Sequence, residues 1–220
     1  MKEIDVISLQ VALLHASRLI VEKESFLTQL DNIVGDGDHG TGMRDGFLEL
    51  SQTALQESYA SLYDLVYASG VSLVKTMGGA SGVIFGTLFI GGRNAFLDEA
   101  GTKLQSAGVC AFRSFFRQSA ESIAKRGRAK PNDRTMLDAL LHAVEAMDAY
   151  TGDDVQALLY EGWQGAQRGV EATKQMLPRM GRTKNFRDVA LGYPDPGACS
   201  TAFIFQGLYE GLQNSEENEF

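Results

Sequence analysis

Cysteine, basic residues and long apolar runs are all scarce in this sequence. The two cysteines, Cys110 and Cys199, lie far apart with no C-x-x-C motif, which argues against a disulfide scaffold and against a zinc site. The 28 acidic residues outnumber the 20 basic ones, and the net charge of −8 argues against nucleic acid or an anionic membrane surface as a partner. No apolar run reaches the roughly 18 residues that a membrane-spanning helix needs.

The length and composition are those of a globular domain. Apolar residues make up 44% of the 220 residues and charged residues 22%, which is enough for a substantial core. Residues 1–5 carry acids where a signal peptide would carry basic and then apolar residues. Together with the cysteine pattern, this predicts a cytoplasmic protein. We expect residues 1–220 to form a single domain with a frayed polar tail at 213–220.

Helical periodicity recurs along nearly the whole chain. Apolar residues spaced by three and four predict helices over residues 4–29, 43–57, 60–77, 83 onward, 104–126, 134–149, 154–176 and 198–212. Residues 177–197 contain several prolines and glycines instead and predict a long irregular loop. No segment shows convincing strand alternation, so the sequence predicts an all-α fold.

The most informative stretch, residues 30–43, directly follows the first predicted helix. Asp31, Asp36 and Asp38 lie among four glycines, whose backbone can come close to a ligand. Carboxylates this close in sequence repel one another unless a cation lies among them, and hard divalent cations prefer oxygen ligands. In an extended segment Asp36 and Asp38 point to the same side, and Asp31 at the helix end can complete the cluster. The stretch therefore predicts a divalent cation site.

Other interpretations fit these residues less well. Residues 35–40 match G-x-G-x-x-G, but a helix precedes them where a dinucleotide site needs a strand. An EF-hand loop needs a glutamate where this chain has Phe47 or Gly42. A turn whose aspartates bond to their own backbone explains one aspartate well and three poorly. His39 by itself is equivocal, because a lone histidine is more often a structural hydrogen-bonding residue.

A second glycine-rich segment, residues 78–82, precedes an apolar stretch that reads as a buried helix. Small residues at a helix N-terminus leave free N–H groups that can bind an anion. A tightly packed core helix that is entered by a turn explains the same residues equally well.

Four blocks of sequence, in this order, resemble the L-subunit family (DhaL type, or Dak-L domain) of dihydroxyacetone kinase. They are Asp31 with residues 35–40 (GDGDHG), residues 78–82 (GGASG), residues 129–138 (AKPNDRTMLD) and residues 195–198 (DPGA). The resemblance covers residues 5–212. It implies an eight-helix antiparallel barrel with a nucleotide bound at one end, and the absence of a P-loop motif from the sequence agrees with a kinase that uses metals held by aspartates.

The resemblance also implies which residues form the site. Asp31, Asp36 and Asp38 would hold two Mg²⁺ against the phosphates of ADP or ATP, and Arg182 would join these aspartates in catalysis. The residues implied to contact the nucleotide are His39, Gly40, Thr41, Gly42, Ala80, Ser81, Gly127, Met136, Arg182, Asp195, Pro196 and Gly197.

The chain departs from the family pattern in three places. Gly42 stands where relatives often have asparagine, so a side-chain contact is missing there. Residues 181–188 (GRTKNFRD) replace the usual Gly-Arg-Ala-Ser…Leu-Gly-Glu-Arg segment, and residues 192–194 (GYP) replace the usual Gly-His. These changes preserve nucleotide binding but leave the sugar substrate and the partner open, and an erythrulose-like ketose is an alternative to dihydroxyacetone.

By this resemblance, the chain is a phosphotransferase subunit that passes a phosphoryl group to a hydroxyl of dihydroxyacetone or a similar short ketose. In the family a separate K subunit holds the ketose covalently, and nothing in these 220 residues resembles that subunit, so we expect the chain to be inactive alone. In one branch of the family an M-type phosphotransferase-system subunit rephosphorylates bound ADP in place. In the other branch ATP exchanges freely.

Two other functions remain open from the sequence. An ADP-binding regulatory module would act through a protein partner, with the altered residues 184–188 as its contact. A helical structural protein would bind Ca²⁺ through the acidic loop and would not bind nucleotide. Phosphorylation of a ketose in the presence of a K subunit would distinguish the enzyme from the regulatory module. A preference for Ca²⁺ without nucleotide binding would indicate the structural protein. Homo-oligomerisation is also left open.

Overall fold

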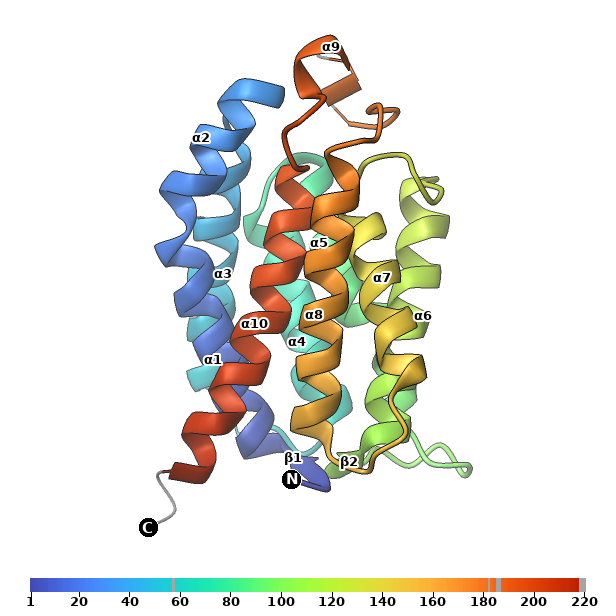
Figure 1. Ribbon diagram of the computed structural model, residues 1–220. Coiled ribbons are helices and arrows are strands. Elements are labelled where there is room, and N and C mark those ends of the chain that lie inside the picture. Colours follow the sequence, from blue (N-terminus) through green and yellow to red (C-terminus); the bar gives the residue numbers. More distant parts are fainter. Residues whose placement is uncertain (57, 182, 185–186, 218–220) are drawn as a thin grey trace.

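A computed structural model describes residues 1–56, 58–181, 183–184 and 187–217, and its long helices run side by side along one axis (Figure 1). The elements are, in chain order, β1 (Glu3–Asp5), α1 (Val6–Glu22), α2 (Glu24–Val34), α3 (His39–Gln56), α4 (Leu62–Thr76), α5 (Gly79–Ile90), the 3₁₀ helix η1 (Arg93–Phe96), β2 (Ser106–Gly108), α6 (Val109–Gly127), α7 (Met136–Ala149), α8 (Val155–Thr173), α9 (Arg187–Ala190) and α10 (Pro196–Glu217).

Within the described part of the chain, eight helices close a ring in which each packs against the next. The order around the ring is α1, α3, α4, α5, α6, α7, α8 and α10, and α10 returns to α1. Helix α2 is not part of this ring and packs on α3 and α10 (Figure 1). The ring confirms the predicted all-α barrel.

Phenylalanine side chains fill the middle of the barrel. Phe96 of η1 stacks on Phe115 of α6 with 5.2 Å between ring centroids. The ring centroids of Phe116 of α6 and Phe205 of α10 are 4.6 Å apart. The residual cavity among these and neighbouring apolar residues is about 20 Å³. So small an apolar space has no room for a ligand, so the middle of the barrel is packed core and no binding site.

The first predicted helix, over residues 4–29, is in fact a strand and two helices. Residues 3–5 form β1, which pairs antiparallel with β2 and places Ile4 opposite Ala107. The helix then breaks at Lys23, and α2 continues to Val34. Apolar spacing continues across the break, and a three-residue strand is too short to show alternation, so the sequence pattern showed neither feature.

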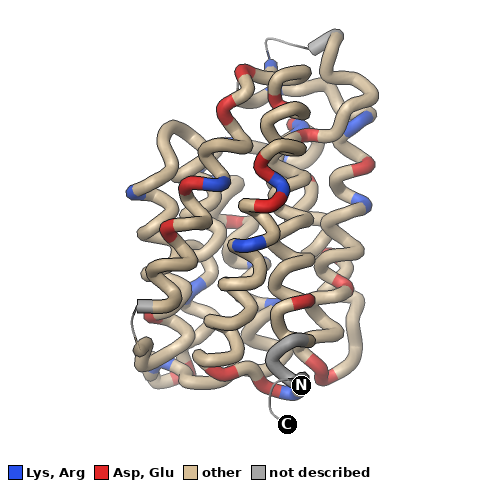
Figure 2. The backbone as a smooth tube through the Cα atoms, turned by 90° about the vertical axis from the view of Figure 1, so that its left-hand side faces the viewer, with Lys and Arg blue, Asp and Glu red and all other residues tan. Residues whose placement is uncertain are grey.

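At the other end of the chain, α10 continues to Glu217 rather than ending at residue 212, and residues 218–220 lie outside the described part. Acidic and basic residues are interspersed along the helices (Figure 2). Among the described residues, no helix combines the length and the apolar character that crossing a bilayer requires.

Candidate functional site

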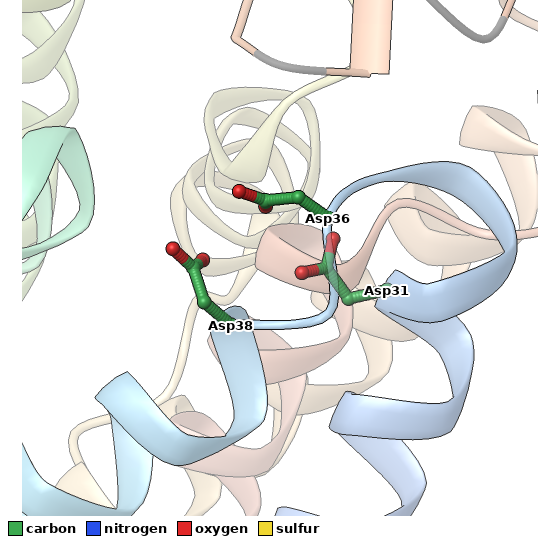
Figure 3. A group of neighbouring side chains, drawn as sticks. All are labelled: Asp31, Asp36 and Asp38. Carbon is green, nitrogen blue, oxygen red and sulfur yellow. The ribbon is translucent and has the colours of Figure 1, made fainter.

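Three aspartates from the α2–α3 region meet at one point. Asp31 lies in the last turn of α2, Asp36 in the following loop and Asp38 directly before α3, and their carboxylates extend into a shared space (Figure 3). One carboxylate oxygen of each lies within 4.8 Å of those of the other two. Asp31 is buried, whereas Asp36 and Asp38 are exposed. The structure thus brings together the acidic triad, Asp31, Asp36 and Asp38, as the sequence spacing predicts.

Helix α3 begins earlier than the sequence predicts. Its first residue is His39, so residues 39–42 form its first turn rather than a loop. The His39 N–H donates to Asp31 Oδ2 at 3.1 Å, and the Gly42 N–H donates to the carbonyl of Asp38 at 3.0 Å. Because the N-terminus of a helix favours negative charge, the start of α3 stabilises the carboxylates of the acidic triad.

Gly40 and Gly42 differ in their surroundings. A Cβ at Gly40 would lie 2.5 Å from the carbonyl oxygen of Glu24 and 2.2 Å from Thr28 Oγ1, both on α2. A Cβ at Gly42 would meet nothing within 4 Å. Gly40 therefore allows α3 to approach α2 closely, which keeps the two ends of the acidic loop together.

A cavity of about 580 Å³ lies beside the acidic triad. Its wall is completed by the start of α5, the end of α6, the α6–α7 connection and the start of α10, and its volume suits a ligand of nucleotide size. The predicted site residues that line it are Asp31, Asp36, Asp38, His39, Ala80, Ser81, Gly127, Met136, Asp195, Pro196 and Gly197.

Four predicted site residues are not among the described residues that line the cavity. Gly40, Thr41 and Gly42 lie in the first turn of α3, beyond the lining residue His39. Arg182 lies outside the described residues, as do residues 185–186 of the altered segment.

Helix α5 begins at the cavity without a side-chain cap. Gly78 occupies the N-cap position and has no side chain that could cap the helix. Ala80 and Ser81, in the first turn, line the cavity. The first N–H groups of a helix have no partner within the helix, and the helix dipole favours an anion at this end. The start of α5 is therefore suited to bind phosphate oxygens.

Another part of the lining is apolar. Ile84, Ile123, Met136 and Met180 contribute to it. A Cβ at Gly127 would lie 3.1 Å from Ile84 Cδ1, so glycine keeps this part of the cavity open. The cavity thus combines an acidic end, free helix N–H groups and an apolar wall, which is the combination that a metal-bound nucleotide requires.

Two titratable side chains of the cavity wall, the half-buried His39 and the buried Asp195, have shifted pKa values. Burial lowers the pKa of His39 to about 4, although the negative charge of Asp31 acts to raise it. The Nε2 of His39 lies 2.9 Å from Ser200 Oγ. Burial raises the pKa of Asp195 to about 6, and the positive charge of Arg134 opposes that shift. His39 is therefore neutral at pH 7 and serves as a hydrogen-bonding group rather than a cation.

Sequence reasoning did not identify Arg134 as a site residue, although it also lines the cavity. Met180 and Thr183, on the irregular segment before α9, were missed as well. The only signal for Arg134 was its place within the third block of the resemblance, residues 129–138.

Comparison with characterised proteins finds relatives that this chain matches over most of their length and relatives of which it spans about a third. The PEP-dependent dihydroxyacetone kinase 1 ADP-binding subunit DhaL of Listeria innocua is 31% identical over 87% of this chain and 89% of its own length. The corresponding DhaL subunit of Escherichia coli is 31% identical over 84% of this chain and 87% of its own. The L-erythrulose kinase of Pectobacterium atrosepticum is 32% identical over 90% of this chain, which spans only 33% of that enzyme.

A solved structure and a family model agree with these relatives. The crystal structure of the dihydroxyacetone kinase from C. freundii, in complex with AMP-PNP and Mg²⁺, matches with a TM-score of 0.70 and 27% identity. The match covers 92% of this chain and 33% of that one. The model of the DAK2 domain matches residues 33–210. This chain belongs to the DAK2 domain family.

Proposed function

We propose that this chain is the nucleotide-binding subunit of a dihydroxyacetone kinase. It would transfer a phosphoryl group from a Mg²⁺-bound nucleotide to dihydroxyacetone or a similar short ketose held on a separate K subunit. The observation that carries the proposal is the acidic triad at the edge of a cavity that also contains the uncapped start of α5. Relatives of matching length are named ADP-binding subunits.

The donor set of the acidic triad fits Mg²⁺. Its three carboxylates offer only oxygen ligands, and their mutual repulsion within 4.8 Å is relieved when a cation lies among them. A diphosphate beside three carboxylates also needs more positive charge than one ion supplies, which supports the two ions that the resemblance implies. Bound Mg²⁺ would neutralise charge that develops on the phosphates.

The residues of the chain would bind and orient the nucleotide. The N–H groups at Ala80 and Ser81 would donate to phosphate oxygens, because the start of α5 leaves them without helical partners. The adenosine would lie against the apolar wall beside Gly127 and Met136. Arg182 would neutralise charge on the transferred group, a role that rests on the resemblance alone.

The relatives bear on the phosphoryl donor and on the ketose. Those that this chain matches over most of their length are named PEP-dependent or PTS-dependent, which favours bound ADP that an M-type subunit rephosphorylates in place. The altered residues 181–188 and the similarity to L-erythrulose kinase support an erythrulose-like ketose as the alternative substrate.

The proposal is tested by denaturing freshly purified protein and identifying what it releases. Chromatography and elemental analysis are expected to give ADP with about two magnesium ions per chain. A purified K subunit and dihydroxyacetone or erythrulose are then added with a phosphoryl donor, and ³¹P NMR follows the phosphorylated ketose. Nucleotide binding without turnover would favour the ADP-binding regulatory module, and protein that neither carries nor binds nucleotide would refute the proposal.

A further inference from the structure

Arg134 is a fully buried arginine beside the Asp195–Gly197 turn. Its exposed fraction is 0%. Its Nη2 donates to the carbonyl oxygens of Ala190, Tyr193 and Pro194 at 3.2, 3.0 and 3.3 Å. A single guanidinium nitrogen thus holds the main chain that leads into α10.

The rest of the guanidinium is poorly satisfied. Its Nε and Nη1 have no hydrogen-bond partner among the described residues, and Nη1 lies 3.9 Å from Asp195 Oδ1, which is beyond hydrogen-bonding distance. Arg134 also has a φ of 61°, in the left-handed region that residues other than glycine rarely adopt.

Both features are costs to the stability of the free protein. Buried donors without partners are unfavourable, and an apolar side chain of similar volume often stabilises a core at least as well as a buried ion pair. Strained backbone in a cavity wall is typical of functional sites. An arginine that carries both costs, and that lines the cavity, is better explained by the site than by folding.

Asp195 connects Arg134 to the cavity. Asp195 Oδ2 accepts from the Ala198 N–H at 2.8 Å and so caps the start of α10, while the Asp195 N–H donates to Thr173 Oγ1 at 3.0 Å. The positive charge of Arg134 favours the ionised form of the Asp195 carboxyl, which accepts a stronger hydrogen bond from the Ala198 N–H than the protonated form would. The capped turn presents Pro196 and Gly197 to the cavity.

We propose that Arg134 is a positioning residue of the nucleotide site, which acts through Asp195 and the carbonyls of Ala190, Tyr193 and Pro194 to hold the start of α10 against the cavity. This inference rests on the proposed function, because the bound ligand is taken to be a Mg²⁺–nucleotide.

The test is calorimetric titration of MgADP into the full chain after its nucleotide has been removed. The variants are Arg134→Met, Arg134→Lys, Asp195→Asn and the Arg134→Met, Asp195→Asn double variant. Arg113→Met is the matched control, because Arg113 also donates to two main-chain carbonyls, those of Met147 and Tyr150. It lies near the opposite end of α6 from Gly127, roughly 20 Å away along the helix.

Arg134→Met is expected to weaken MgADP binding about 10- to 100-fold, as loss of a supporting partner does at other sites. Arg134→Lys keeps the positive charge but lacks the planar guanidinium group, and its MgADP affinity should fall about three- to tenfold. Arg113→Met should leave the affinity within about twofold of the wild type, whatever it does to the melting temperature. In the Asp195→Asn background, Arg134→Met should cost less than it does alone, because the two residues act through one turn.

A folded Arg134→Met protein that binds MgADP within about twofold of the wild type would overturn the inference, and so would additive losses in the double variant. If Arg134→Met does not fold, an unchanged affinity in Arg134→Lys overturns it instead. A wild-type chain that binds no MgADP would defeat the proposed function itself, which separates the two failures.

Discussion

The backbone N–H of His39 donates a 3.1 Å hydrogen bond to Oδ2 of Asp31 and so ties the first residue of α3 to the last turn of α2. The bond closes the acidic loop on itself and places Asp36 and Asp38 beside Asp31 (Figure 3). The geometry of the acidic triad therefore depends on how closely α3 approaches α2.

Alanine substitutions at Gly40 and Gly42 should have opposite effects on stability. Gly40→Ala places a Cβ against Glu24 and Thr28 of α2, and we expect a loss of about 1–3 kcal/mol from overpacking. In Gly42→Ala the added Cβ lies in open space, and we expect the free energy of unfolding to rise by up to about 1 kcal/mol because alanine has the higher helix propensity. Urea unfolding followed by circular dichroism measures both. Equal effects of the two substitutions would refute the described packing of α3 on α2.

These two glycines also show what the sequence could and could not predict. Glycine at 40 and 42 is typical of a loop, and a loop is what the sequence predicts at both positions. In the structure both lie in the first turn of α3, where Gly40 packs against α2, a contact that local spacing does not reveal. The acidic triad was predictable, because three aspartates so close in sequence repel one another unless a cation lies among them. Arg134 was not, since its partners are carbonyls 56 to 60 residues later in the chain.

The stability of the metal-free, nucleotide-free protein should depend on pH through His39. Its pKa is about 4 when folded and about 6.5 when unfolded, so between these values the unfolded chain binds a proton that the folded chain does not. The contribution of His39 to the free energy of unfolding therefore rises from pH 4 to pH 6.5, by about 3 kcal/mol, and is then constant.

His39→Gln, which keeps a hydrogen-bonding group near Ser200, should lack this rise. The quantity to measure is the difference between wild type and variant in urea titrations at several pH values. A difference that stays constant across the range would show that the pKa of His39 is not lowered in the folded protein.

The two cysteines should differ sharply in reactivity. Cys110 is exposed, whereas Cys199 is buried in α10, and burial raises the pKa of its thiol to about 12. Because the thiolate is the reactive form, Ellman's reagent at pH 8 should modify one thiol rapidly and the second only after unfolding. The Cys110→Ser variant should be unreactive while folded, and rapid labelling of that variant would contradict the described packing of α10.

Gly127→Leu should weaken nucleotide binding without weakening metal binding. A Cβ there already lies 3.1 Å from Ile84 Cδ1, so a larger side chain would occupy the apolar part of the cavity. We expect at least a tenfold loss of ADP affinity, equal to about 1.4 kcal/mol, with Mg²⁺ affinity unchanged. Both are measurable by calorimetry, and unchanged ADP affinity would place the base elsewhere.

The most direct test of the account is calorimetric titration of Mg²⁺ and of MgADP into wild type, Asp36→Asn and Asp38→Asn, each freed of bound nucleotide and metal. Asp153→Asn is the control, since Asp153 is an exposed acid paired with Lys2 near the chain's N-terminus. We predict that both triad variants lose metal and nucleotide affinity together by at least about tenfold, while the control and wild type bind alike. Wild-type nucleotide affinity in either triad variant would contradict the assignment of the acidic triad as the metal site.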